Sequence, residues 1–265
     1  MSPSSTELYY SKLNTSVREA LGGLHSADCI IRSVDFEEIA QLQTADRWDD
    51  AGELLGQAAA GLEAGGAEVL ILATNTMHKV APAIKRSITI PFIDIFSATA
   101  AAVVDAGCSR PLLMATAYTM EQDFCLDRLR EAGLSPVVPN AEDRAAIHRI
   151  IFDELCKGAE NGVFLLRFIS LLCLSRACVS RQIDRFSQEI SKKRDVSAGE
   201  IHEESRTVYE TIAARYLAAG ADSVILGCTE VGMLLHEGNV EAEVFDTAMI
   251  HCGTALTFAL PPTQE

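Results

Sequence analysis

Helical and strand patterns of apolar residues alternate along most of this 265-residue chain. Apolar residues recur at helical spacing from Leu8 to Leu21, and the Gly22-Gly23 pair that follows favours the end of a helix. The pattern predicts helices over 8–21, 49–64, 97–106, 120–132, 141–157, 203–219 and 247–260, and strands over 29–36, 69–73, 90–95, 112–115, 136–139, 223–227 and 243–245. Helices and strands in alternation predict parallel β-α-β units, and therefore an α/β fold with helices on both sheet faces.

The chain contains an internal repeat, because residues 66–76 align without a gap to residues 220–230. Each copy has a glycine that ends a helix, then an apolar strand, then a small polar cluster. One interpretation is that any two helix-strand units look alike. The other is that two similar lobes face each other. Since ligands of open α/β sheets bind beyond the carboxyl ends of strands, Thr74 and Cys228 would then meet across one cleft.

Two segments break the pattern. The chain opens with a helix and no preceding strand, so we expect the first strand of the fold to be missing from this sequence. Residues 160–199 carry seven Lys and Arg against four Asp and Glu, in a chain whose net charge is −15. Three interpretations of 160–199 stay open: a surface insertion, a basic amphipathic helix for a membrane or partner, or a faulty gene model.

The composition excludes several classes of function. A net charge of −15 repels polyanions, which argues against nucleic acid and anionic membranes as main partners. No apolar run reaches the roughly 18 residues of a membrane span, and the first residues do not resemble a signal peptide. The eight cysteines lack C-x-x-C spacing, which is typical of reduced thiols in the cytoplasm. Phosphate-loop, H-E-x-x-H and G-x-S-x-G motifs are absent from the sequence.

The candidate chemistry lies in two polar clusters at predicted strand ends, residues 74–79 and 227–230. A thiol at Cys228 would lie near backbone N–H groups and the positive end of a helix, so we expect its pKa to be lowered. The alternative is that Cys228 is a small core residue. Gly227 would let a ligand approach the backbone closely.

The other polar residues of these clusters have two interpretations each. Asn75, Thr76 and Thr229 are short donors that suit a carboxylate ligand, or they cap helices. His78 and Lys79 balance the charge of an anionic substrate, or they are surface groups.

These motifs resemble the aspartate/glutamate racemase family. Thr-Asn-Thr-Met-His-Lys at 74–79 and Gly-Cys-Thr-Glu at 227–230 match it in order and spacing, and the similarity covers nearly the whole chain except 160–199. The resemblance implies two pseudo-symmetric three-layer α/β lobes with parallel sheets and an active site in the cleft between them. It places one lobe at 1–95, completed by 246–265, and the other at 96–245.

The resemblance implies an enzyme that racemises aspartate, glutamate or both with no cofactor and no metal, and it suggests a homodimer. The cysteine pattern adds the expectation of a cytoplasmic location. Racemisation needs an acid/base group on each face of the α-carbon. In the family these groups are usually two cysteines, of which Cys228 matches the second, whereas the first falls on Thr74. A hydroxyl is far less acidic than a thiol, whose reference pKa is about 8.5. We therefore expect fast proton exchange at Cys228, slow exchange at Thr74, and activity that differs between enantiomers.

Substrate contacts also follow from the resemblance. They are carried over to Asn75, Thr76, Thr116, Thr119 and Thr229 for the α-carboxylate, with Gln43, Lys79 and Arg32 for the side-chain end. Alternative functions are a decarboxylase, a maleate-type isomerase or a hydantoin racemase of the same superfamily, or a catalytically impaired amino-acid-binding protein. Because a missing first strand would leave backbone groups unpaired, we expect a marginally stable or inactive protein.

Overall fold

The computed structural model describes residues 1–156, 198–235 and 238–260. The larger of its two sheets has three parallel strands in the order β3-β4-β5. These strands are β3 (Pro111–Ala115), β4 (Ser223–Gly227) and β5 (Glu243–Asp246). Every residue of β3 and β4 is buried, as expected for a parallel sheet that is covered on both faces.

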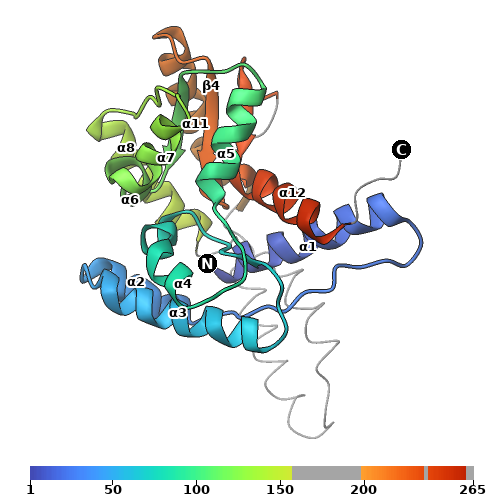
Figure 1. The fold of residues 1–265 in the computed structure, drawn as a ribbon. Coiled ribbons are helices and arrows are strands. Elements are labelled where there is room, and N and C mark those ends of the chain that lie inside the picture. Colours follow the sequence, from blue (N-terminus) through green and yellow to red (C-terminus); the bar gives the residue numbers. More distant parts are fainter. Residues whose placement is uncertain (157–197, 236–237, 261–265) are drawn as a thin grey trace, which may run out of the picture.

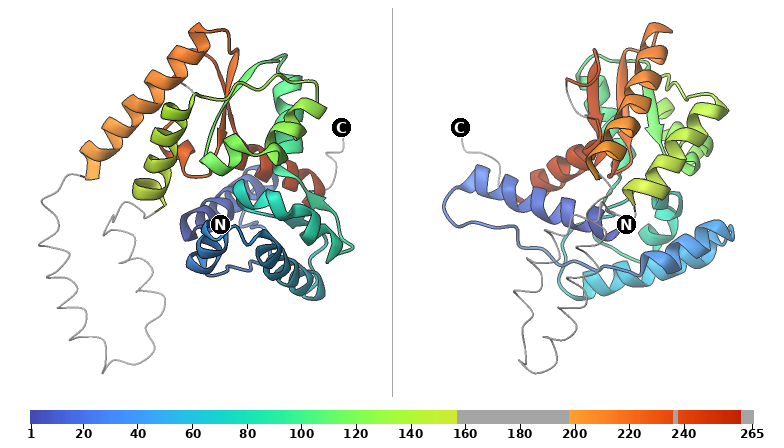
Figure 2. Two further views of the ribbon diagram at one scale, coloured as in Figure 1. Left: turned by 90° about the vertical axis from the view of Figure 1, so that its left-hand side faces the viewer. Right: turned by 180° about the vertical axis from the view of Figure 1, so that it is seen from behind.

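Helices cover both faces of this sheet, so this part of the molecule has three layers (Figures 1 and 2). They are α5 (Ile95–Asp105), α6 (Ala117–Glu121), α7 (Asp123–Glu131), α8 (Ala141–Ile150) and α11 (Ala198–Ala218). Helix α8 continues into one π-helical turn at Ile151–Leu155. In the views of Figure 2, α5 and α7 lie on one side of the sheet and α8 and α11 on the other.

A second apolar core lies around a two-stranded parallel sheet. Its strands are β1 (Leu70–Ile71) and β2 (Phe92–Ile93), and its helices are α2 (Phe36–Thr44), α3 (Trp48–Ala64) and α4 (Ala81–Arg86). Buried Ile39, Leu55, Met77 and Ile84 belong to this core. The family fold is thus confirmed as α/β with short parallel sheets, whereas the lobe boundaries at 95 and 246 stay a prediction.

The first and last helices pack together. Helix α1 (Pro3–Leu21) and helix α12 (Thr247–Ala259) share a small core of Tyr9, Ala248 and Cys252. Figure 1 shows this pair between the three-stranded sheet and the α2–α4 helices. In the described part of the chain, no helix is long and apolar enough to cross a membrane.

The predicted strand at 29–36 is wrong. The chain there is an extended loop, and α2 begins at Phe36 with the Asp35 carboxylate accepting a hydrogen bond from the Glu37 N–H at 3.1 Å. Apolar runs become strands only when a neighbouring strand pairs with them. No described strand pairs with this loop, and Ile30 and Ile31 stay about half exposed, at 50% and 49%.

Two smaller predictions need correction, and a third is not tested. The predicted strand at 136–139 is reduced to one bridge between Leu112 and Val137, because its two prolines lack the N–H that a ladder needs. The predicted helix at 120–132 is divided at Gln122, whose backbone is extended. The predicted segment 160–199 lies outside the described residues except for its last two, which begin α11.

Two buried histidines connect the elements around β2. His78 Nδ1 donates to the Thr74 carbonyl at 2.7 Å, and His78 Nε2 accepts from the Ile95 N–H at 3.1 Å. His251 on α12 donates through Nε2 to the Ile93 carbonyl at 3.0 Å and accepts from the Tyr9 hydroxyl at 2.9 Å. Both rings are therefore neutral. Burial lowers the pKa of His78 to about 3 and the pKa of His251 to about 4.

Acid should destabilise the protein through these histidines. Below pH 6.5, the ordinary histidine pKa, both histidines are protonated in the unfolded chain but stay neutral in the folded protein. Acid therefore favours the unfolded state, and the stability present above pH 6.5 is lost as the pH falls towards 4. We expect the free energy of unfolding to fall by roughly 3 kcal/mol between pH 7.5 and 5.5. Urea denaturation at both pH values measures this. The fall should halve in His78→Gln and persist in the control His25→Gln, which changes an exposed residue; an unchanged fall in His78→Gln contradicts the assignment.

Candidate active site

Two buried loops follow the carboxyl ends of β1 and β4. The first holds Thr74, Asn75 and Thr76 and continues into a 3-10 helix at Thr76–Val80. The second holds Cys228 and Thr229. Each of these five side chains is buried, with at most 8% of its surface exposed. The two copies of the sequence repeat therefore both place short polar side chains in the interior, just past a strand.

Three threonine hydroxyls join the first loop to the start of α6. Thr76 Oγ1 lies 3.0 Å from Thr116 Oγ1 and 3.4 Å from Thr119 Oγ1, and Thr116 Oγ1 lies 3.2 Å from Thr119 Oγ1. Thr116 is also the N-cap of α6, where its hydroxyl accepts from the Thr119 N–H. The prediction that these three residues share a site is consistent with this clustering, although their contact with a substrate stays a prediction.

A second cluster joins the loop after β4 to the first turn of α1. Glu230 is buried, and its Oε1 accepts from Ser2 Oγ at 2.5 Å and from Ser5 Oγ at 3.0 Å. Its Oε2 accepts from Thr229 Oγ1 at 2.5 Å and from Cys228 Sγ at 3.1 Å. Ser5 Oγ also lies 2.6 Å from Thr229 Oγ1. The Glu230 carboxylate thus accepts hydrogen bonds from three hydroxyls and one thiol.

The expected lowering of the Cys228 pKa is wrong. Burial raises the pKa of the Cys228 thiol well above its ordinary value, and the negative charge of Glu230 raises it further. The helix after Cys228 is a 3-10 turn of three residues, Val231–Met233, so it supplies little of the dipole that a longer helix would. In the free protein Cys228 is therefore a thiol and not a thiolate.

Asn75 is the one residue of the first loop whose side chain is unsatisfied. Both its Oδ1 and its Nδ2 are buried without a hydrogen-bond partner in the protein. A buried amide that leaves both atoms unpaired costs about 1–3 kcal/mol, so such groups indicate a missing ligand or water. Asn75 offers one acceptor and two donor hydrogens to whatever fills that space.

The three residues carried over for the substrate side chain lie in different surroundings. Gln43 is buried and donates through Nε2 to Met77 Sδ at 2.8 Å. The Lys79 ammonium lies 3.7 Å from the centre of the Trp48 ring, and partial burial lowers the pKa of Lys79. Arg32 is exposed in the loop before α2. Gln43 therefore contacts the 74–80 segment through Met77, and Lys79 belongs to that segment.

The sequence analysis missed Glu230, Ser2 and Ser5 as parts of the site. Glu230 is the last residue of the second repeat and corresponds to Thr76 in the first. Because Thr76 is a predicted site residue, this correspondence is a signal in the sequence that Glu230 also belongs to the site. No such signal exists for Ser2 and Ser5, because their partner lies about 225 residues away in sequence, at separations of 228 and 225.

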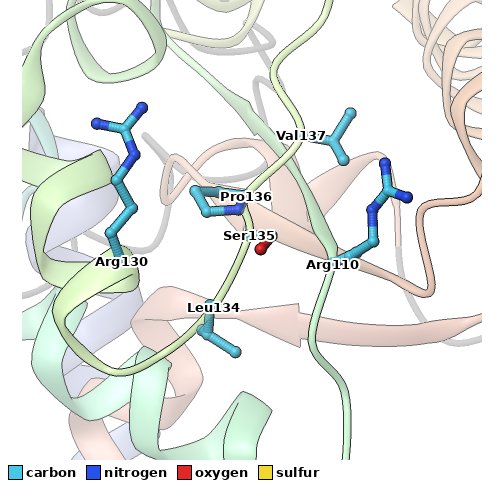
Figure 3. A pocket seen from close by; sticks show the side chains of 6 residues that line it. All are labelled: Arg110, Arg130, Leu134, Ser135, Pro136 and Val137. Atoms are coloured by element: carbon cyan, nitrogen blue, oxygen red, sulfur yellow. The ribbon is translucent and has the colours of Figure 1, made fainter.

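A surface hollow elsewhere does not belong to this site. Arg110, Arg130, Leu134, Ser135, Pro136 and Val137 line it (Figure 3). Arg110 directly precedes β3, so the hollow lies at the amino end of that strand, opposite the two loops. Arg130 already forms an ion pair with Asp127 at 3.2 Å.

In the described parts of the chain, no group of three or more His, Cys, Asp or Glu side chains could hold a metal ion.

Gly227 lets β4 lie close to β3 directly before Cys228. A Cβ at this position would lie 2.8 Å from Ala115 Cβ and 3.0 Å from Leu113 Cδ1. Gly227→Ala should therefore lower the free energy of unfolding by about 1–3 kcal/mol, because the strands must separate. Urea denaturation checks this against the control Gly253→Ala, where the new methyl group meets nothing within 4 Å. Equal stability of the two variants would contradict the tight packing.

Comparison with known proteins supports a common origin for this architecture. The sequence model of a family described as Asp/Glu/Hydantoin racemase matches residues 1–172. A structure described as an Asp/Glu racemase from Yersinia pestis shares 36% identity with a TM-score of 0.76, covering 97% of this chain and 95% of that one. An aspartate racemase homologue from Pyrococcus horikoshii OT3 shares 30% identity with a TM-score of 0.69, covering 97% and 94%. The aspartate racemase of Picrophilus torridus, at 16% identity and a TM-score of 0.62 over 97% and 90%, has a similar fold.

Proposed function

Because this chain belongs to the Asp/Glu/hydantoin racemase family, we propose that it interconverts the L and D forms of aspartate, glutamate or both without a cofactor. Cys228 exchanges the α-proton on one face of the substrate and Thr74 on the other. The observation that carries the proposal is the buried Cys228 thiol at the end of β4, 3.1 Å from a carboxylate that can receive its proton. Thr74 occupies the matching place after β1 in the sequence repeat.

The α-carboxylate of the substrate fits the buried donors of the two loops. The unsatisfied Asn75 amide gains a partner when a carboxylate enters, which removes the free-energy cost of its burial. Thr76, Thr116 and Thr119 donate hydroxyl hydrogens from one cluster, and Thr229 can donate from the other when its hydroxyl turns away from Glu230. An acidic substrate is held best by charge-assisted hydrogen bonds of this kind.

The side-chain carboxylate needs a second polar pocket, and Lys79 and Gln43 are proposed to supply it. Lys79 brings a positive charge that lies over the Trp48 ring and forms no ion pair with a carboxylate of the described residues, so an anion can approach it. Gln43 donates to a thioether sulfur, which is a weak acceptor, and a carboxylate oxygen would be a better partner.

A homodimer and a cytoplasmic location are proposed with this function. The six described cysteines are free thiols, in keeping with a reducing compartment.

The test is α-proton exchange in D2O by purified protein, with each enantiomer of aspartate and glutamate and no added pyridoxal phosphate. Proton NMR follows loss of the α-proton, and chiral chromatography follows inversion. We expect turnover of at least one of the two amino acids, with unequal exchange rates for its enantiomers. A 5-substituted hydantoin, which lacks both carboxylates, should not react. No exchange with any of the four acids contradicts the function.

The same preparation tests the expectation of a marginal or inactive protein. A cooperative thermal transition together with racemisation would contradict that expectation.

A further inference from the structure

Glu230 is bonded as an ionised carboxylate. It is buried, and four donors point at its two oxygens, three of them hydroxyls and the fourth the Cys228 thiol. Burial alone would raise the pKa of Glu230, but the hydrogen bonds from Ser2 and Thr229 outweigh it and lower the pKa below its ordinary value. The resting pair is thus a neutral thiol beside a carboxylate anion.

A thiolate at Cys228 can form by two routes. If the thiol proton leaves to water, two anions stand 3.1 Å apart in a buried site, where like charges strongly oppose each other. If the proton moves to Glu230 Oε2, the pair keeps a single negative charge, which only changes place. The second route avoids burying a second charge. We propose, as an extension of the proposed racemase function, that Glu230 is the proton acceptor for the Cys228 thiol.

The protons balance over one exchange event. The Cys228 S–H bond breaks as the Glu230 O–H bond forms, and the thiolate then removes the substrate α-proton, which restores the thiol. Water on the Thr74 side protonates the opposite face of the α-carbon. Glu230 releases its proton to water, and the pair returns to a thiol and a carboxylate.

Three other titratable groups face the pair from neighbouring elements: the α-amino group of Met1 on the α1 side, the Cys156 thiol after the π-helical turn, and the Tyr209 hydroxyl on α11. Burial lowers the pKa of the Met1 amino group to about 6, raises that of Cys156 to about 12, and raises that of Tyr209 well above its ordinary value. Cys156 and Tyr209 therefore stay protonated at pH 7–9, a range in which the Cys228–Glu230 pair can be followed.

Glu230→Gln tests the proposal because it keeps the shape of the side chain and removes both its charge and its proton affinity. We expect α-proton exchange to fall about 100-fold. In the same variant the rate of iodoacetamide reaction at Cys228, followed by peptide mass spectrometry from pH 6 to 10, should shift to lower pH by about one unit or more. The thiol becomes easier to ionise while turnover falls, and these opposed changes are not expected of a residue that only supports the loop.

Glu154→Gln is the matched control. Glu154 is a half-buried carboxylate that accepts from Ser205, and in the described structure it has no hydrogen bond to Cys228, so this variant should keep exchange within twofold of wild type. Exchange by Glu230→Gln within threefold of wild type overturns the proposal. So does a loss of exchange with an unchanged iodoacetamide profile, since the thiol and the carboxylate would then be independent.

Folding and the substrate assignment are controlled separately. If Glu230→Gln does not melt cooperatively, Glu230→Asp takes its place: it keeps the charge but withdraws the carboxylate from the sulfur, and exchange must fall at least tenfold or the proposal fails. The iodoacetamide profile needs no substrate. An inactive wild-type protein therefore defeats the proposed function, while the profile still decides whether the charge of Glu230 controls the ionisation of Cys228.

Discussion

Replacing Cys228 with serine should abolish racemisation, with a loss of at least about 10³-fold in exchange at the α-carbon. A serine hydroxyl ionises far less readily than a thiol, so the variant lacks a base for one face of the substrate. The side chain is buried, and serine fits the same space, so the protein should fold normally. Proton NMR in D2O with the preferred amino acid measures the loss.

Binding separates the enzyme from the alternative of a catalytically impaired amino-acid-binding protein. Calorimetry should show that Cys228→Ser still binds the amino acid, because the contacts proposed for its carboxylates are made by other residues. Cys29→Ser, which changes an exposed cysteine, is the matched control and should keep full activity. Activity of Cys228→Ser close to that of wild type would remove Cys228 from the mechanism.

Introducing a thiol on the opposite face should have the reverse effect. In Thr74→Cys we expect exchange of the slower enantiomer to rise by about 100-fold, so that the two enantiomers react at similar rates. Thr74 is buried at 8% exposure and its N–H already bonds the Leu72 carbonyl at 2.7 Å, so the backbone holds the new side chain in place. The exchange rates of the two enantiomers of one amino acid, measured in parallel in D2O, give the ratio.

Thr99→Cys controls for a general effect of adding a thiol. Thr99 is fully buried on α5, where its hydroxyl donates to the Ile95 carbonyl, and it lies outside both loops. This variant should leave the ratio of the two exchange rates unchanged. An unchanged ratio in Thr74→Cys would show that position 74 does not face the α-carbon.

The strands that the sequence predicts well are those buried on both faces. The apolar run at 223–227 is β4 residue for residue, because burial in a parallel sheet leaves an unbroken apolar pattern. The equally apolar start of 29–36 pairs with no strand in the described part of the chain and remains a loop. Strand pairing is a property of the whole fold, so local pattern cannot decide it.

The candidate site is also predicted only in part from the sequence. Thr76, Thr116 and Thr119 were expected together from the resemblance, and their hydroxyls do cluster. The predicted direction of the Cys228 pKa shift is wrong because burial of the thiol raises its pKa, and Glu230, whose side chain reaches back to the sulfur two residues earlier, raises it further. Charge and burial around one atom are set by packing, which spacing along the chain does not encode.

The bonds from Ser2 and Ser5 to Glu230 bear on how the protein is made. They close loops of 228 and 225 residues, among the longest that this chain can form, and long loops are slow to close during folding. Until a ribosome has released residue 230, the first turn of α1 has no carboxylate to meet. In a nascent chain the serines of α1 and the carboxylate of the candidate site therefore stay apart until residue 230 has emerged and these loops have closed.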